Sequence, residues 1–169
     1  MSGETLKLTP SESLTVREST PGVLEVEALY GPGGEPPPAH YHPAHEERFE
    51  VLEGSVHERV DGEERVLRQG DTLTLPQGAV HQMWNPGGDA ARVSWKSLPR
   101  GRTYEWFAAI DSLQRQGRVG KSGLPGPLAL AVLLTEYDDV IRPAVKPEPL
   151  VRGALALLAP IGRARGYKA

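Results

Sequence analysis

The chain has 169 residues, of which 38% are hydrophobic, and its formal charge is −3 at pH 7. This length suits one domain with a sizeable core, or one domain with an appendage, and the acidic balance argues against a nucleic-acid-binding surface. The sequence contains no cysteine, which excludes disulfides, thiol nucleophiles and thiolate ligands. Its 19 glycines and 16 prolines are typical of a β-rich fold with many turns.

The first 39 residues predict short strands and a turn. Residues 1–22 are polar except for four apolar side chains that suggest short edge strands: Leu6, Leu8, Leu14 and Val16. Residues 23–30 place apolar side chains at every second position, which predicts a half-buried strand. A run rich in glycine and proline follows over residues 31–39, and its prolines stiffen the approach to His40.

Residues 34–54 carry the first group of side chains with metal-binding chemistry. On a strand, residues two apart share a face, so His40 and His42 project into the same space. Glu47 can join them if the chain bulges or turns at Pro43–Ala44. Two imidazoles and one carboxylate that converge on one point make a plausible divalent metal site.

A hairpin and a second group follow. The sequence SVHERV leads into Asp61-Gly62, a strong hairpin signal, and ERVLRQ returns. Residues 70–85 then contain a Gly-Asp turn, a short strand, His81 and Asn85. Residues 85–90 predict another turn, and residues 92–96 predict the last strand of the β-rich part.

From Thr103 the apolar spacing becomes helical. A first helix has Thr103 as a possible N-cap and Gly117 as a stop, with an apolar stripe made of Trp106, Phe107, Ile110 and Leu113. A second stripe, ended by Pro143, consists of Leu130, Leu133, Leu134, Tyr137, Val140 and Ile141. A third, which Pro160 would kink or end, consists of Val151, Ala154, Leu155, Leu158 and Ile161. These short helices should pack on the β-rich part or on a second subunit.

Ten positions in residues 34–54 and 70–85 resemble the two cupin motifs in spacing and order. They are Gly34, His40, His42, Glu47 and Gly54 in the first motif, and Gly70, Pro76, Gly78, His81 and Asn85 in the second. The resemblance implies a mainly β fold, a double-stranded β-helix or jelly-roll cupin barrel over residues 1–99. About three short C-terminal α-helices would form a helical extension over residues 100–169. The matched positions give His40, His42, Glu47 and His81 as ligands of one divalent ion inside the barrel.

Nitrogen and carboxylate ligands suit Mn²⁺, Fe²⁺, Ni²⁺, Co²⁺ or Zn²⁺, and four of them leave roughly two of six octahedral positions free. The alternation places Phe49, Val51 and Met83 along the walls of the cavity. His45 is expected at the surface, in the loop or on the outer face. His57 is expected to be exposed or at a subunit contact.

Glu58 allows two interpretations. It shares a face with Val56 and Val60, so it points inward if the valines do. It then either lies near the barrel mouth or pairs with an arginine, or it acts as a polar pocket residue that handles protons near the metal. Both interpretations need a paired or hydrated carboxylate, because an unpaired buried charge is costly.

Three classes of function remain open from the sequence. The first is a metal-dependent enzyme acting on a small chelating anion, with dioxygenase-like chemistry favoured. The others are a non-redox isomerase or lyase that uses the ion as a Lewis acid, and a binding module without turnover. We expect a small-molecule ligand, a homodimer that covers open sheet edges, and a cytoplasmic location. We expect neither a nucleic-acid nor a membrane partner.

Overall fold

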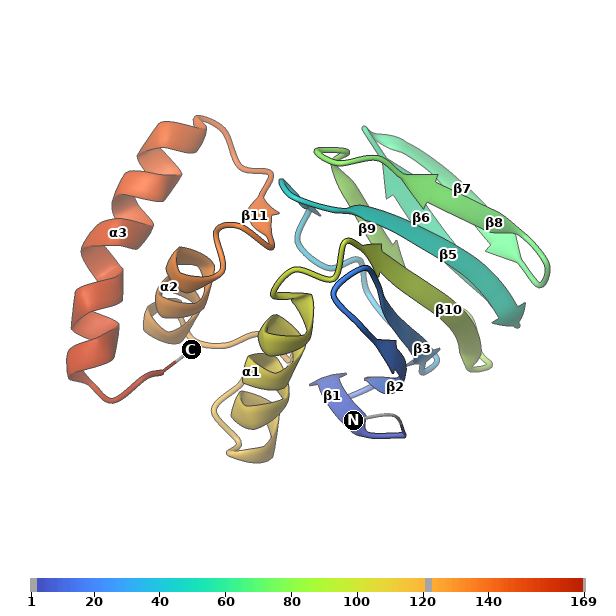
Figure 1. Ribbon diagram of the computed structural model, residues 1–169, viewed down its shortest axis with the longest axis horizontal. Coiled ribbons are helices and arrows are strands. Elements are labelled where there is room, and N and C mark those ends of the chain that lie inside the picture. Colours follow the sequence, from blue (N-terminus) through green and yellow to red (C-terminus); the bar gives the residue numbers. More distant parts are fainter. Residues whose placement is uncertain (1–2, 121–122, 169) are drawn as a thin grey trace.

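The computed structural model describes residues 3–120 and 123–168. Figure 1 shows two antiparallel sheets that face each other, with the helices gathered on one flank. The first sheet has the strand order β1-β2-β3-β10-β5-β8. Its strands are β1 (Thr5–Thr9), β2 (Glu12–Ser19), β3 (Leu24–Tyr30), β10 (Ala91–Leu98), β5 (Glu46–Glu53) and β8 (Thr72–Leu75). The edge position predicted for the first strand is found for β1, whereas β2 lies between β1 and β3.

The second sheet has the order β11-β4-β9-β6-β7. Its strands are β11 (Arg142–Pro143), β4 (His40–Tyr41), β9 (His81–Trp84), β6 (Ser55–Val60) and β7 (Glu63–Arg68). Strand β11 comes from the C-terminal region. The chain therefore returns to the second sheet between its second and third helices. The antiparallel sandwich followed by helices confirms the predicted fold class.

The core lies between the two sheets because alternate side chains of each strand point inward. It is built from residues such as Leu14, Val26, Val51, Val56 and Val93, each no more than 1% exposed.

The hairpin predicted at Asp61-Gly62 is present, and Gly54 forms a second turn. Asp61 and Gly62 both have positive φ, 49° and 93°, which suits the two-residue hairpin between β6 and β7. Gly54 also has positive φ, and a Cβ there would lie 2.9 Å from the carbonyl oxygen of Ala90. Glycine is therefore required where the chain passes from β5 in one sheet to β6 in the other.

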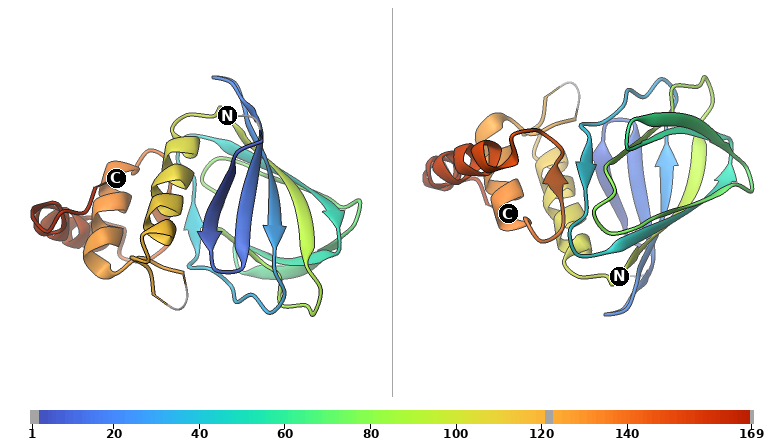
Figure 2. Two further views of the ribbon diagram at one scale, coloured as in Figure 1. Left: turned by 90° about the horizontal axis from the view of Figure 1, so that it is seen from below. Right: turned by 90° about the horizontal axis from the view of Figure 1, so that it is seen from above.

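The three helices stack outward from one side of the barrel, with α1 nearest the strands and α3 farthest (Figure 2). They are α1 (Thr103–Arg115), α2 (Pro127–Glu136) and α3 (Glu148–Ala164). Helix α1 packs against β1, and α2 packs against α3. At Gly162 a Cβ would lie 2.7 Å from the carbonyl oxygen of Leu128 and from a methyl of Val132. The close approach of α2 and α3 therefore depends on this glycine.

The helices differ from the sequence prediction in three respects. Thr103 is the first residue of α1 and not its N-cap, which is Arg102. Helix α2 ends at Glu136, so the predicted continuation to Ile141 is wrong, because the chain leaves the helix to pair β11 with β4. Helix α3 runs through Pro160, and the carbonyl that this proline leaves without a donor belongs to Ala156, which is exposed to water.

The apolar stripe predicted for α3 is rotated in the structure. Ala159 and Gly162 are buried, whereas Leu158 and Ile161 of the predicted stripe are 37% and 48% exposed. The predicted homodimer, which would cover such residues, stays a prediction. Within residues 3–120 and 123–168, none of the helices combines the length and the apolar character needed to cross a bilayer.

Candidate metal centre

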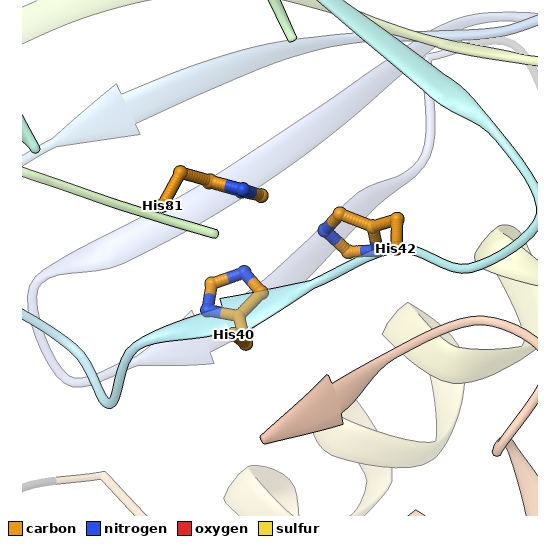
Figure 3. Close-up of side chains that lie close together, drawn as sticks. All are labelled: His40, His42 and His81. Atoms are coloured by element: carbon orange, nitrogen blue, oxygen red, sulfur yellow. The ribbon is translucent and has the colours of Figure 1, made fainter. Parts of the chain in front are cut away.

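The two sequence motifs meet between the sheets. His40 in β4 pairs with His81 in β9, and His42 lies just beyond β4 on the same face as His40. Figure 3 shows the three imidazoles turned toward a common space. Each can offer one ring nitrogen, and these three atoms lie within 4.8 Å of one another. Three side chains predicted as ligands are therefore neighbours in space.

Each of the three imidazoles has its Nδ1 atom at a backbone carbonyl. The distances are 2.9 Å from His40 to Pro38, 2.7 Å from His42 to Val140 and 3.1 Å from His81 to Ala79. A carbonyl only accepts, so Nδ1 carries the proton in each ring. In a neutral ring the lone pair is then on Nε2, the atom that faces the cluster and can bind a metal ion.

Glu47 brings a carboxylate to the cluster from the opposite sheet. It is 1% exposed, and its Oε1 lies 3.4 Å from Nε2 of His42 while its Oε2 lies 3.2 Å from Nε2 of His81. The indole N–H of Trp95 donates to Oε1 at 3.0 Å, which holds the carboxylate in place. Trp95 thus packs against Phe49 and Phe107 in the core and also makes a polar contact with Glu47 that the sequence did not reveal.

The surroundings bias the protonation states of these groups. Burial, together with His81 and His42, lowers the pKa of His40 to about 3, and burial also lowers the pKa of His42. Burial alone would raise the pKa of Glu47, but the adjacent imidazoles outweigh it and hold that pKa well below its usual value. Burial opposes protonation of His81, yet the contact with Glu47 raises the pKa of His81. His40 and His42 are therefore neutral beside an ionised carboxylate, and this carboxylate favours the protonated form of His81.

The donor set fits a divalent metal ion. Nε2 of His42 and Oε2 of Glu47 are buried and have no hydrogen-bond partner. Buried polar atoms are rarely left without a partner, and a cation shared by these atoms would satisfy both. Imidazole nitrogen with one carboxylate is the donor chemistry of Mn²⁺, Fe²⁺, Ni²⁺, Co²⁺ or Zn²⁺.

His45 is not at the surface, and that prediction is wrong. It is 4% exposed, and its Nε2 lies 3.7 Å from Oε1 of Glu47. The signal was present in the sequence: His45, Glu47, Phe49 and Val51 are alternate residues, and all four are buried. The inward-facing series of β5 therefore begins before the strand itself.

Glu58 is buried at 1% exposure and forms an ion pair with Arg65 on the neighbouring strand β7. This is the arginine pairing that one interpretation anticipated. Its Oε2 has no hydrogen-bond partner, and its charge adds to the rise in the pKa of His81. A role of Glu58 in proton transfer stays a prediction. His57 is partly exposed beside Glu64, with 3.1 Å between Nδ1 and Oε1.

A cavity of about 660 Å³ is lined in part by Gln82, Met83 and Trp84, which follow His81 in β9, but its lining includes none of the clustered histidines and not Glu47. Met83 lines it, whereas Phe49 and Val51 lie in the packed core. The cavity also contains Glu12 and Tyr30, two polar residues that the sequence reasoning missed. Nothing in the local sequence marks them, because β2 and β3 bring them to the cavity from outside both motifs.

Comparison with known proteins agrees with the resemblance of the two motifs to those of cupins. Residues 26–96 match the family model described as "Cupin domain". Germin-like protein 12-2 of Oryza sativa subsp. japonica is 32% identical over 90 residues, 47% of this chain and 39% of that protein. Quercetin 2,3-dioxygenase of Bacillus subtilis is 36% identical over 84 residues, 47% of this chain and 25% of that protein. This chain thus spans less than half the length of these curated relatives.

A solved structure agrees in fold. The RmlC-like cupin from Shewanella frigidimarina superposes with a TM-score of 0.54 and 20% sequence identity, over 60% of this chain and 88% of that one. The matched family model and both motifs identify residues 26–96 as a cupin domain, and the shared double-sheet architecture agrees with this fold.

Proposed function

We propose that this protein is a metal-dependent enzyme that acts on a small, chelating, anionic organic compound, by dioxygenase-type chemistry. The observation that carries the proposal is the convergence of one ring nitrogen each from His40, His42 and His81 beside the ionised carboxylate of Glu47. A bound divalent ion would supply Lewis acidity and, for iron or manganese, redox chemistry.

The charge of the donor set supports an anionic substrate. Three neutral imidazoles and one carboxylate leave a divalent ion with a net charge of about +1. The surrounding core is apolar, so a negatively charged ligand that offsets this charge is favoured over a neutral one. A compound with two adjacent oxygens can use both positions that four protein ligands leave open.

The cavity lined by Met83 and Trp84, which follow His81 in β9, suits a small organic molecule. Its volume of about 660 Å³ falls in the range of ligand pockets, which are largely apolar with a few polar groups. Met83 and Trp84 provide apolar lining, and Glu12 and Tyr30 provide polar groups. Burial raises the pKa of Glu12 to about 7, so its protonated form can donate a hydrogen bond to an anionic oxygen near neutral pH.

The relatives support oxygen chemistry over the alternatives. One of them is named as a dioxygenase of quercetin, an aromatic compound with adjacent oxygens. The match covers a quarter of that protein, so the substrate of this chain is proposed by its chemical class and not by that name.

Metal analysis and oxygen uptake test the proposal together. Untagged protein should contain about one equivalent of iron or manganese. An oxygen electrode should then record uptake with at least one member of a panel of diketones, catechols and 2-oxo acids. His40→Ala should lose both the metal and the uptake, and the matched control His57→Ala, outside the cluster, should keep both.

Other outcomes separate the remaining classes of function. Zinc with no oxygen uptake would contradict dioxygenase chemistry and favour an isomerase or lyase. Tight binding of a panel anion with no turnover would favour a binding module. Absence of any stoichiometric metal in the wild-type protein would overturn the proposal as a whole.

A further inference from the structure

His45 lies in the metal centre although it belongs to neither motif. Of the five histidines in the sequence, four are in this cluster and His57 is the one outside it. His45 is 4% exposed, and its ring centroid lies 4.4 Å from that of His42. Its Nε2 is buried without a hydrogen-bond partner. A histidine with a purely structural role would be expected to satisfy this nitrogen.

Two groups of possible ligands overlap at His42. In one group the nitrogens of His40, His42 and His81 lie within 4.8 Å of one another, and in the other the ligand atoms of His42, His45 and Glu47 do. Glu47 joins the groups, because its Oε1 faces His42 and His45 while its Oε2 faces His81. The four motif residues and His45 therefore form one continuous donor set.

A hydrogen bond between His45 and Glu47 does not account for this arrangement. The distance between Nε2 of His45 and Oε1 of Glu47 is 3.7 Å, beyond the 2.7–3.2 Å typical of such bonds. Oε1 already accepts from Trp95 at 3.0 Å and lies 3.4 Å from His42. A cation placed among these atoms would use the free nitrogen of His45 and attract the carboxylate at the same time.

We propose that Nε2 of His45 is an additional ligand of the metal ion, so that the centre has four histidines and one glutamate. This inference rests on the proposed metal-dependent function and makes it more specific. A fourth imidazole favours Fe²⁺, Co²⁺, Ni²⁺ or Zn²⁺ over Mn²⁺, which prefers oxygen ligands. Five protein ligands would leave about one of six octahedral positions open, where the four motif ligands alone would leave two.

The test compares Co²⁺ binding by the wild type, His45→Gln and the matched control His57→Gln. Competition with a chelator gives the dissociation constant, and the visible spectrum of bound Co²⁺ reports the ligands. His45→Gln should weaken Co²⁺ binding at least about tenfold, weaken Mn²⁺ binding less, and change the Co²⁺ spectrum. His57→Gln should leave both metals and the spectrum unchanged.

A measurement on the wild type keeps the proposal testable if His45→Gln does not fold. Proton NMR of the Co²⁺-loaded protein should show four paramagnetically shifted, exchangeable imidazole N–H signals. Three such signals, or a His45→Gln variant with an unchanged Co²⁺ spectrum, would overturn the role of His45 as a ligand. Failure of the wild type to bind Co²⁺ would instead overturn the proposed function, so the two failures are distinguishable.

Discussion

The carbonyl oxygen of Val140 accepts a hydrogen bond from Nδ1 of His42 at 2.7 Å, across 98 residues of sequence. The segment after α2 thus reaches the candidate metal centre. It is held there by pairing of β11 with β4 and by the hydroxyl of Tyr41, which donates to Glu148 at 2.9 Å. The C-terminal region therefore helps to orient a predicted metal ligand.

This contact predicts that a change at Val140 weakens metal binding. Val140→Gly removes a buried side chain, 2% exposed, and loosens the backbone whose carbonyl orients His42. Loss of such an outer contact typically costs about 10- to 100-fold in metal affinity, and we expect the lower end. Titration with Co²⁺ measures the metal affinity of each variant. Val145→Gly is the matched control, because Val145 is 53% exposed, and equal weakening by both variants would contradict the prediction.

His42→Ala should abolish stoichiometric metal binding. His42 is the one residue shared by the two groups of ligand atoms found among the described residues, so its loss removes a donor from both. Metal analysis after dialysis against Co²⁺ provides the measurement, with His57→Ala treated in parallel. Retention of one equivalent by His42→Ala would mean that the ligands are assigned wrongly.

Trp95→Phe should weaken metal binding about tenfold and leave the fold intact. Phenylalanine can keep the ring contacts with Phe49 and Phe107, at centroid distances of 5.4 and 5.0 Å, but it cannot donate to Glu47. The carboxylate then loses the bond that orients it. Trp84→Phe is the control, because the indole of Trp84 contacts His57 instead, and its Co²⁺ affinity should match the wild type.

Arg65→Ala should destabilise the protein by about 1–3 kcal/mol, because it leaves the buried carboxylate of Glu58 unpaired. Arg65 itself is 61% exposed, which favours the lower part of this range. Chemical denaturation measures the free energy of unfolding. Adding Glu58→Gln to Arg65→Ala should restore part of the loss, and a double variant less stable than Arg65→Ala would argue against the pairing.

The stability contributed by Glu12 should depend on pH. Burial raises the pKa of Glu12 from 4.5 to about 7, so the folded state holds its proton more tightly than the unfolded state. The stability that Glu12 contributes is therefore fully present below pH 4.5 and is lost as the pH rises through about 7. Glu12→Gln should raise the melting temperature at pH 8 and change it little at pH 4.5.

The exposed Glu50 on β5 supplies the control for this measurement. Glu50→Gln should show no comparable difference between the two pH values. If the difference in stability between the wild type and Glu12→Gln is the same at pH 4.5 and at pH 8, the raised pKa of Glu12 is contradicted.

The sequence by itself determined the fold class and the four motif positions at the centre. Motif spacing carries this information because strands alternate their faces with a period of two, so His40 and His42 must share a side. The same rule could have placed His45 inside, since it is two residues before Glu47. The sequence does not place His45 inside with certainty, because side chains alternate between the two faces within a strand but not in the loop that precedes it.

Only the tertiary structure decided the contacts between distant segments. The bond from His42 to Val140, the indole of Trp95 on Glu47, and Glu12 in the cavity each join elements far apart in the chain. The end of α2 was likewise decided by pairing of β11 with β4, which outweighed a helical apolar pattern. Such contacts depend on how sheets and helices pack in three dimensions, and no local periodicity records that packing.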